Sequence, residues 1–292
     1  MKPIKAAAIQ MDISHCKKQD NINKALMLSE DAISHGAELI VLPEVFSTGF
    51  CYEELENSGE SEPFPTIEQL RDFSKQNSCV MIGSIIQKHN NEEVQKNEKR
   101  EREGVEVDID IELKGKRGEE QGKNNFTNMG FCIENGDLAG TYTKTHPFGK
   151  EKGYFTPGDQ IEPIHLKSHD LTIGLEICYE MRFPEIARKL AIEGSDILVT
   201  IAEFPNPREY QWRSLATARS VENQIYHIAC NRTGADPSST FFGASMILDP
   251  LGNVLADAKD KECFIIQEID PEMMKDTRKA IPVFDDRRPE LY

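Results

Sequence analysis

Three polar residues stand where stretches of apolar sequence end, and together their side chains could perform acyl transfer. Glu44 follows Leu39–Leu42, Cys178 follows Leu171–Ile177, and Lys144 comes at the end of another expected strand. A thiolate is a strong nucleophile that needs a nearby base or cation, and a positive charge would stabilise a developing oxyanion. Open α/β sheets build their sites at strand ends. Spacing alone does not bring the three side chains together.

The elements that must position these residues alternate between strands and helices. Apolar runs, apolar residues at helical spacing, and boundary Gly and Pro residues predict them. We expect strands at 4–11, 38–42, 79–87, 126–134, 138–144, 171–177, 197–201 and 225–231, helices at 21–35, 66–76, 184–193 and 211–223, and a final hairpin around 249–253. The alternation predicts an α/β fold, and the absence of a short-period repeat favours one domain.

Composition narrows the class of protein. The chain has 292 residues, of which 38% are hydrophobic and 29% charged, as in globular proteins. The formal net charge is -16, without a dense basic segment to offset it, so nucleic acid and anionic membranes are poor partners. The N-terminal apolar run is too short for a signal peptide or a membrane span, and we expect a cytoplasmic protein.

One segment, from about 88 to 123, differs from the rest of the chain. It is crowded with Lys, Glu and Arg and has no aromatic residue, so most of it should lie outside the core. Within it, Val105–Leu113 alternates apolar and acidic residues, which predicts a half-buried strand in a hairpin at the sheet edge. A solvated loop suits Asn90–Gly104 better. The insertion could cover a pocket, extend a dimer edge or lie in solvent.

The seven cysteines, at 16, 51, 79, 132, 178, 230 and 263, show no C-x-x-C spacing. An odd number without paired spacing argues against a disulfide framework and against a zinc ribbon. We therefore expect most of them to be small buried hydrophobic residues.

Three sequence segments carry a resemblance to a known family. Leu42–Glu44, Lys144–Phe148 and Gly174–Glu185 resemble, in the correct order, the signature segments of the nitrilase, or carbon-nitrogen hydrolase, superfamily. The similarity covers nearly the whole chain apart from the insertion. It implies an α-β-β-α sandwich forming a single domain over 1–292, interrupted by the charged insertion at about 88–123.

The resemblance also implies roles for individual residues. Cys178 would attack the amide carbon, and Glu44 would act as general base and then acid. Lys144 and the backbone N–H of Tyr179 would stabilise the oxyanion. Glu151 is the candidate for a second glutamate that family members often carry. The resemblance implies no metal and no organic cofactor.

Each of these residues also has a structural interpretation. Taken alone, Cys178 would be an inert core thiol, Glu44 a helix cap and Lys144 a solvated charge on a hairpin. Arg182 is interpreted as an ion-pair partner or loop anchor, and His146 as a positioning or packing residue rather than a base.

Segments further along the chain suggest the substrate. Four of them are similar to the omega-amidase branch of the superfamily: 202–208 with Trp212, 218–224, 231–234 and 281–289. That branch implies hydrolysis of the side-chain amide of small α-keto dicarboxylate monoamides, such as 2-oxoglutaramate. Phe148, Glu203 and Arg208 are the candidate substrate contacts, although a surface or dimer-interface role suits Arg208 equally.

Other functions remain open at this point. The same triad could hydrolyse an N-carbamoyl compound or, less in keeping with the downstream resemblance, a nitrile. A non-catalytic binding protein could use the same fold, because fold does not determine function. The superfamily commonly dimerises, so we expect a homodimer or higher homo-oligomer in which residues 276–292 take part.

Overall fold

Two six-stranded sheets form the centre of the molecule. The structure is a computed structural model that describes residues 2–89 and 125–291. The first sheet has the order β14-β1-β2-β3-β4-β5, formed by β14 (Cys263–Ile269), β1 (Ile4–Gln10), β2 (Leu39–Val41), β3 (Val80–Lys88), β4 (Phe126–Glu134) and β5 (Asp137–Thr143). The second has the order β13-β12-β9-β8-β7-β6, formed by β13 (Val254–Asp257), β12 (Met246–Leu248), β9 (Tyr226–Asn231), β8 (Ile197–Ala202), β7 (Leu171–Ile177) and β6 (Ile164–Leu166).

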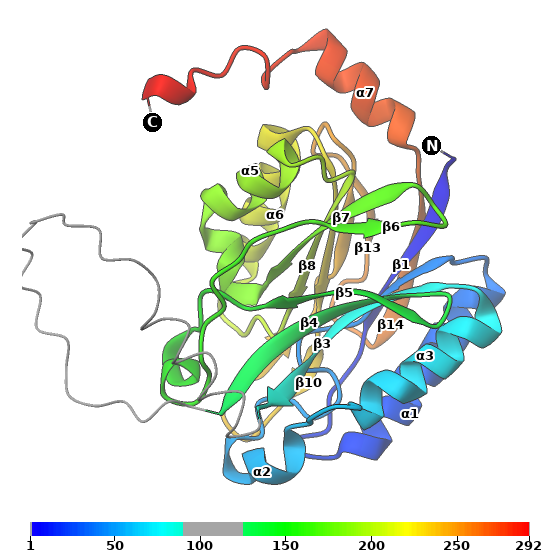
Figure 1. Ribbon diagram of the computed structural model, residues 1–292, viewed down its shortest axis with the longest axis vertical. Coiled ribbons are helices and arrows are strands. Elements are labelled where there is room, and N and C mark those ends of the chain that lie inside the picture. The colour runs from blue at the N-terminus through cyan, green and yellow to red at the C-terminus, as the bar shows by residue number, and fades with distance from the viewer. Residues whose placement is uncertain (1, 90–124, 292) are drawn as a thin grey trace, which may run out of the picture.

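Two helices cover the outer face of each sheet (Figure 1). Helices α1 (Lys18–Ser34) and α3 (Pro65–Asn77) pack on the first sheet, and α5 (Pro184–Ile192) and α6 (Glu209–Asn223) pack on the second. The remaining elements are shorter or peripheral: η1 (Tyr52–Glu54), α2 (Leu55–Ser58), η2 (Gly149–Gly153), η3 (Cys178–Arg182), β10 (Thr233–Ala235), β11 (Thr240–Phe242), α7 (Pro271–Ala280) and η4 (Pro289–Leu291).

The hydrophobic side chains form three layers, one between the two sheets and one between each sheet and its helices. Ala8 of β1 joins the cluster between the sheets, together with Val199 of β8. The next residue, Ile9, points to the opposite face and packs in the cluster that contains Ile22 of α1. Successive side chains of a strand point to opposite faces, so both faces of each sheet are covered. The α-β-β-α sandwich predicted from the resemblance is confirmed.

Most predicted elements are present, and several were missed, among them the short elements α2, β6, β10 and β11. Helix α1 begins at Lys18 rather than Asn21, and α6 begins at Glu209 rather than Gln211. Strand β14 and helix α7 were not predicted. The strand predicted at Val105–Leu113 lies outside the described residues.

The cysteine prediction needs one correction. Cys16 and Cys51 form a disulfide with a Cα–Cα distance of 5.3 Å. The two residues follow β1 and β2, which are neighbouring parallel strands, so the fold brings together loops that are 35 residues apart. The absence of C-x-x-C spacing carries no information about such a pair. Four free cysteines (79, 132, 178 and 230) are buried, as predicted, and Cys263 is half-buried.

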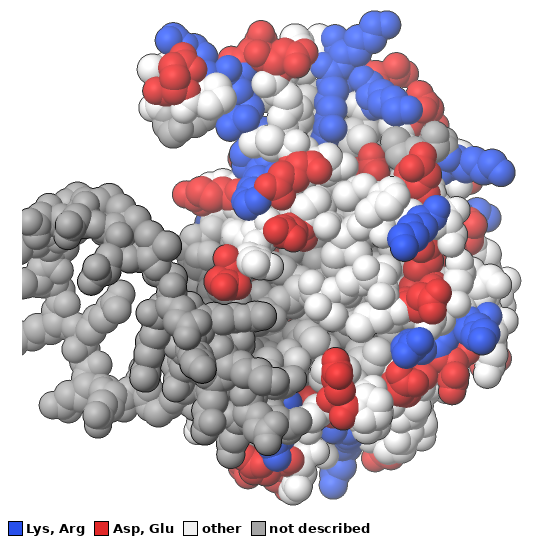
Figure 2. All heavy atoms as spheres, viewed as in Figure 1, with Lys and Arg blue, Asp and Glu red and all other residues white. Residues whose placement is uncertain are grey.

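Charge on the surface is mixed. On the face drawn in Figure 2, acidic and basic side chains of the described residues are interspersed over much of the surface.

Among residues 2–89 and 125–291, no helix combines the length and the apolar character needed to cross a membrane.

Candidate active site

The structure gathers the predicted polar residues at one end of the two sheets. Lys144, directly after β5, places its Nζ 2.7 Å from Oε1 of Glu44, which follows β2. The same ammonium lies 2.9 and 2.8 Å from the two carboxylate oxygens of Glu151, in η2. All three side chains are buried. The arrangement is therefore a desolvated cation held between two carboxylates.

Cys178 completes this cluster from the second sheet. It is the first residue of η3, directly after β7, and its backbone φ is 55°, in the left-handed region. Non-glycine residues in that region are strained and occur often at functional sites. The residue is 9% exposed, and Glu44 is near enough to raise the pKa of its thiol. The guanidinium of Arg219 donates two hydrogen bonds to the carbonyl of Met181, which fixes η3 after the cysteine.

Both oxygens of Glu44 are held by the protein. The side-chain amide of Asn128 donates to Oε1 at 2.8 Å, and the backbone N–H of Glu203 donates to Oε2 at 3.0 Å. The next residue along the chain, Val45, has a φ of 38° and donates its N–H to Oγ of Ser84 at 2.8 Å. These contacts fix the direction of the carboxylate between the thiol and the ammonium.

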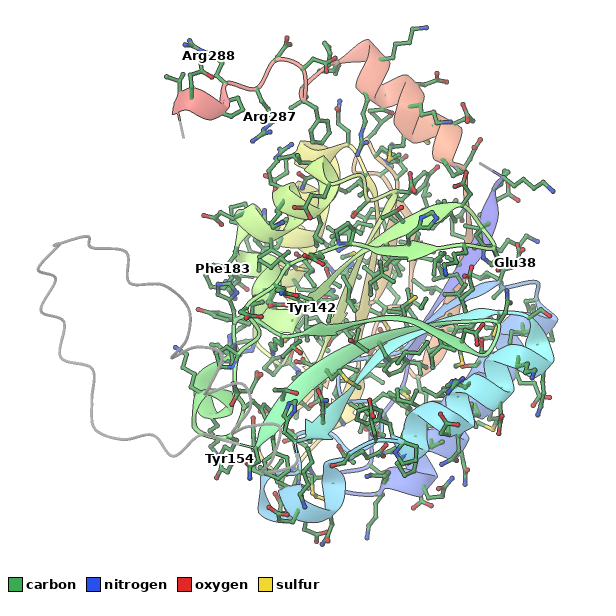
Figure 3. All side chains as sticks on the ribbon, viewed as in Figure 1. Glu38, Tyr142, Tyr154, Phe183, Arg287 and Arg288 are labelled. Carbon is green, nitrogen blue, oxygen red and sulfur yellow. A yellow bond between two sulfur atoms is a disulfide. The ribbon has the colours of Figure 1, made fainter. Side chains whose placement is uncertain are left out.

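Glu180 is a buried residue that the sequence analysis did not single out. Its Oε1 accepts hydrogen bonds from the Tyr142 hydroxyl at 2.6 Å and from the backbone N–H and hydroxyl of Thr145 at 2.7 and 2.6 Å. Its Oε2 accepts from the N–H of Ile177 at 2.7 Å. Figure 3 labels Tyr142 near the middle of the molecule. Glu180 thus connects the strand end before Cys178 with the residue after Lys144.

The electrostatics of the cluster determine the protonation of each group. Burial raises the pKa of the Cys178 thiol well above its usual value, and Glu44 adds to the effect, so the resting sulfur holds its proton. Burial opposes the charge of Lys144, but Glu151 and Glu44 outweigh it and raise the pKa of the ammonium. Burial raises the pKa of Glu151 to about 7 despite the attraction of Lys144. The cluster therefore contains a stable cation and a neutral thiol.

Glu203 lies on the wall of the same site and is buried. Burial raises its pKa to about 8, although Arg232, whose Nη1 is 3.4 Å from Oε2, opposes the rise. Neither carboxylate oxygen has a hydrogen-bond partner in the part of the chain that the structure describes. A carboxyl group in this state is available to a ligand in the cavity.

The cluster opens into a cavity of about 810 Å³. Cys178 and Glu151 line it, together with the three candidate substrate contacts, Phe148, Glu203 and Arg208. The aromatic ring of Tyr179 also lines the cavity and lies 4.7 Å from the ring of Phe148, centroid to centroid.

Two further residues test the sequence interpretation. Arg182 is expected to be an ion-pair partner or a loop anchor, and of these two roles the ion pair is absent among the described residues. Its guanidinium lies 5.5 Å from the ring centroid of Phe204 and lines the cavity. His146 stacks on Phe183, with 4.2 Å between the ring centroids, which is a packing role.

This geometry permits one kind of chemistry in particular. A carboxylate within hydrogen-bonding reach of a thiol can accept its proton, and a fixed ammonium can stabilise negative charge that develops on a substrate oxygen. The family model described as carbon-nitrogen hydrolase matches residues 5–279. The chain belongs to the carbon-nitrogen hydrolase family. It is an enzyme that acts on carbon-nitrogen bonds other than peptide bonds.

Relatives of this carbon-nitrogen hydrolase align along nearly the whole chain. A 2-oxoglutaramate amidase of Bacillus subtilis is 31% identical over 98% of both chains. The human omega-amidase NIT2 is 28% identical over 100% of this chain and 98% of its own length. The crystal structure of Nit3 from Saccharomyces cerevisiae, described as a member of branch 10 of the nitrilase superfamily, superposes with a TM-score of 0.82. It is 25% identical, over 98% of this chain and 97% of that one.

Proposed function

We propose that this enzyme hydrolyses the terminal amide of a small carboxylate-bearing amide, with 2-oxoglutaramate as the best candidate, and releases ammonia. The observation that carries the proposal is the buried contact between Lys144 and Glu44, next to the Cys178 thiol and at the end of an 810 Å³ cavity. Two of the relatives described above support it by their names, one a 2-oxoglutaramate amidase and the other an omega-amidase.

The first half of the reaction follows from the contacts of Glu44. Its carboxylate accepts the thiol proton of Cys178, whose raised pKa makes such a base necessary. The sulfur then attacks the amide carbon, and the ammonium of Lys144 and the N–H of Tyr179 stabilise the oxyanion. Glu44 returns the proton to the amide nitrogen, ammonia leaves, and a thioester on Cys178 remains.

The second half uses the same groups. Glu44 takes a proton from water, whose oxygen attacks the thioester carbon, and the same oxyanion contacts operate again. The proton then returns to the sulfur as the acid product leaves. Glu151 contributes by keeping Lys144 charged and fixed, since both of its oxygens contact Nζ.

Recognition of the substrate carboxylate must be local, because the protein as a whole carries a net charge of -16. Arg182 and Arg208 both line the cavity, and neither has an ion pair with a carboxylate of the described residues. Arginine binds carboxylates with two parallel hydrogen bonds. We assign these two side chains to the α-carboxylate end of the substrate, with the distal amide at Cys178.

Ammonia release tests the proposal directly. Wild type and Cys178→Ala should be compared with 2-oxoglutaramate, an N-carbamoyl amine and an aliphatic nitrile as substrates. We expect release from the keto amide by wild type and none by the variant. Equal rates for both proteins would overturn the assignment of Cys178, and preference for the carbamoyl compound or the nitrile would overturn the substrate class.

We propose further that 1–292 is one catalytic domain with an insertion at about 88–123, and that the protein is cytoplasmic.

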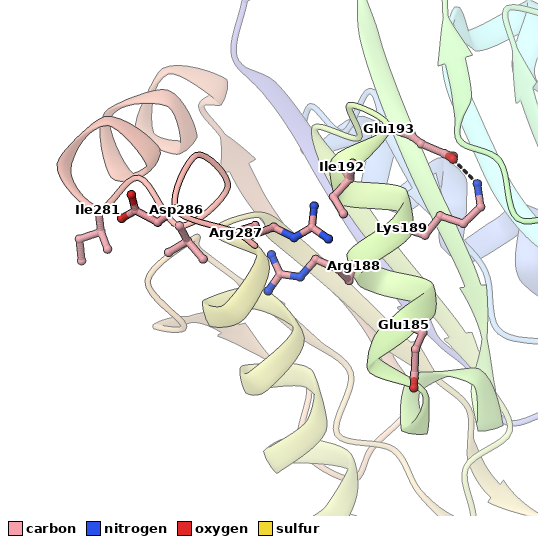
Figure 4. Close-up of a pocket in the computed structure, with 9 residues that line it drawn as sticks. Glu185, Arg188, Lys189, Ile192, Glu193, Ile281, Asp286 and Arg287 are labelled. Carbon is pink, nitrogen blue, oxygen red and sulfur yellow. Dashed lines mark hydrogen bonds and ion pairs between the residues drawn. The ribbon is translucent and has the colours of Figure 1, made fainter. Parts of the chain in front are cut away.

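We also propose a homodimer that uses the segment 276–292. In Figure 4 this segment faces α5 across a shallow pocket of about 820 Å³, and Ile192 and Ile281 are exposed beside it. Light scattering of wild type and Ile281→Asp tests the dimer, since the added charge should give monomers.

A further inference from the structure

Four side chains of types that can bind a metal lie together outside the catalytic cluster, and two of them form the disulfide. His15, Cys16, Cys51 and Glu53 each offer one ligand atom, and these atoms all lie within 4.8 Å of one another. The first two residues follow β1, and the other two follow β2 and enter η1. The fold of the two neighbouring strands therefore assembles the group from two separate loops.

One contact within the group already has the spacing of a zinc site, and another is shorter. An imidazole nitrogen, Nε2 of His15, lies 2.6 Å from Oε1 of Glu53, and Sγ of Cys16 lies 3.7 Å from the same oxygen. Zinc bonds to sulfur, nitrogen and oxygen are about 2.0 to 2.3 Å long, so ligand atoms in a tetrahedral site lie about 3.3 to 3.8 Å apart. Small movements of these side chains, with the two sulfurs separated, produce that spacing.

Two further observations favour a cation at this place. The other ring nitrogen of His15, Nδ1, is buried and has no hydrogen-bond partner among the described residues. No hydrogen bond at Nδ1 within the described part of the chain holds the imidazole ring in place, so the ring can reorient toward a metal ion. Asp236 lines the same cavity as His15 and Glu53, and its carboxylate adds negative charge on that side of the group.

We propose that the reduced protein binds one Zn²⁺ ion through His15, Cys16, Cys51 and Glu53. A dithiol reductant supplies two electrons and two protons to the disulfide, which becomes two thiols while the reductant becomes a disulfide. Zn²⁺ then displaces the two thiol protons and binds both thiolates. The four ligands are two sulfurs, one nitrogen and one oxygen.

The site is a structural link beside the catalytic cavity. His15 and Glu53 line the same cavity as Cys178. Between Cys51 and Glu53, the ring of Tyr52 packs 4.6 Å from that of Tyr154, which is labelled in Figure 3. Whichever link is present, disulfide or metal, it fixes this wall of the cavity.

The neighbouring residue shows how the wall reaches the catalytic cation. The ring centroid of Phe50, next to Cys51 in the chain, lies 5.8 Å from Nζ of Lys144. Disulfides rarely persist in reducing compartments, where the two loops would lose their covalent link. Zinc bound to the same two sulfurs keeps the loops joined there.

Metal binding to the reduced full-length protein tests this proposal without any measurement of activity. Every protein in the experiment carries Cys178→Ser, so that the catalytic thiol binds no metal, and a phosphine reductant replaces thiols, which chelate zinc. Co²⁺ is the probe, because thiolate ligands give it intense charge-transfer absorption. We expect one Co²⁺ per reduced chain, displaced by Zn²⁺, and none in the oxidised protein.

Matched variants connect the signal to the four residues. Cys16→Ser/Cys51→Ser should remove the charge-transfer bands, and Glu53→Gln, on an exposed side chain, should weaken binding by about 10- to 100-fold. Cys263→Ser and Glu54→Gln remove a similar thiol and a neighbouring carboxylate and should bind Co²⁺ as before. Absence of thiolate bands in the reduced protein, or bands that persist in the double variant, would overturn the proposal.

Discussion

The Oε1 atom of Glu180 accepts a hydrogen bond from the backbone N–H of Thr145 at 2.7 Å, and this contact joins the two halves of the catalytic cluster. Thr145 follows Lys144 on the first sheet, and Glu180 lies two residues beyond Cys178 on the second. Interactions with His146, Thr145, Tyr142 and Ile177 outweigh the effect of burial and keep the pKa of Glu180 below its usual value. An ionised carboxylate therefore sets the spacing between cation and thiol.

Replacing this carboxylate should impair catalysis more than folding. In Glu180→Gln an amide N–H₂ group would face donors that now share a carboxylate, so Lys144 and Cys178 would move apart. Displacements of about 1 Å can cost about 100-fold in rate, and we expect kcat to fall by about that factor with a smaller change in KM. Steady-state kinetics below the melting temperature provides the measurement.

A neighbouring glutamate supplies the control for this variant. Glu185, on α5, is exposed, and Glu185→Gln should leave kcat unchanged. Wild-type kcat in a correctly folded Glu180→Gln protein would contradict the positioning role.

Removing the cation of the cluster should destabilise the fold. Lys144→Met leaves Glu44 and Glu151 buried without a positive partner, and breaking a buried ion pair in this way costs about 3 to 5 kcal/mol. Urea denaturation should show this loss in the free energy of unfolding. Adding Glu151→Gln to the first variant should restore part of the stability. If the single and double variants were equally stable, mutual repulsion of the two carboxylates would not be the cause.

Much of the sandwich could be predicted because its central strands are short, buried and continuous. Leu171–Ile177 has an apolar residue at every second position, which predicts a strand, and it forms β7 with those bounds. Strand β14 was missed because its partner, β1, is about 250 residues away along the chain, and a short apolar run near a terminus has no local signal for such pairing. Helix α7 is mostly polar and offers few apolar positions.

In the active site too, some features could be predicted from the sequence and others could not. Glu44, Lys144 and Cys178 lie at strand ends and in segments that resemble the family's signatures, so the sequence could single them out as candidates. The contacts that fix them depend on residues that are distant in the chain, such as Asn128 against Glu44 and Glu180 against Thr145. No local pattern distinguishes a buried glutamate of this kind from a surface one.

Glu203 should make stability depend on pH. Its pKa is about 8 in the folded protein, above the ordinary value of 4.5, so the folded state keeps a proton that the unfolded state has lost. This contribution is fully present below pH 4.5 and disappears as the pH rises through 8. Relative to Glu203→Gln, the free energy of unfolding of wild type should therefore fall between about pH 5 and pH 8, by at most about 1.4 kcal/mol per pH unit.

The measurement is a series of urea titrations of both proteins across that range. The buried His227, whose pKa burial lowers to about 4, titrates in both proteins and cancels in the difference. A difference that does not change between pH 5 and pH 8 would show that Glu203 is ionised throughout.

The two arginines of the cavity should control the affinity for charged substrates. Under the proposed function, Arg182 and Arg208 contact the substrate carboxylate in both the ground state and the transition state, so each removal weakens uniform binding. Hydrogen bonds to charged groups contribute about 1.5 to 3 kcal/mol, and Arg182→Gln and Arg208→Gln should each raise KM for 2-oxoglutaramate about 10-fold or more. The value of kcat should change little. Propionamide, a neutral amide, provides the control, because its KM should be the same in wild type and both variants. An equal rise in KM for both substrates would mean that the arginines shape the cavity rather than bind the carboxylate.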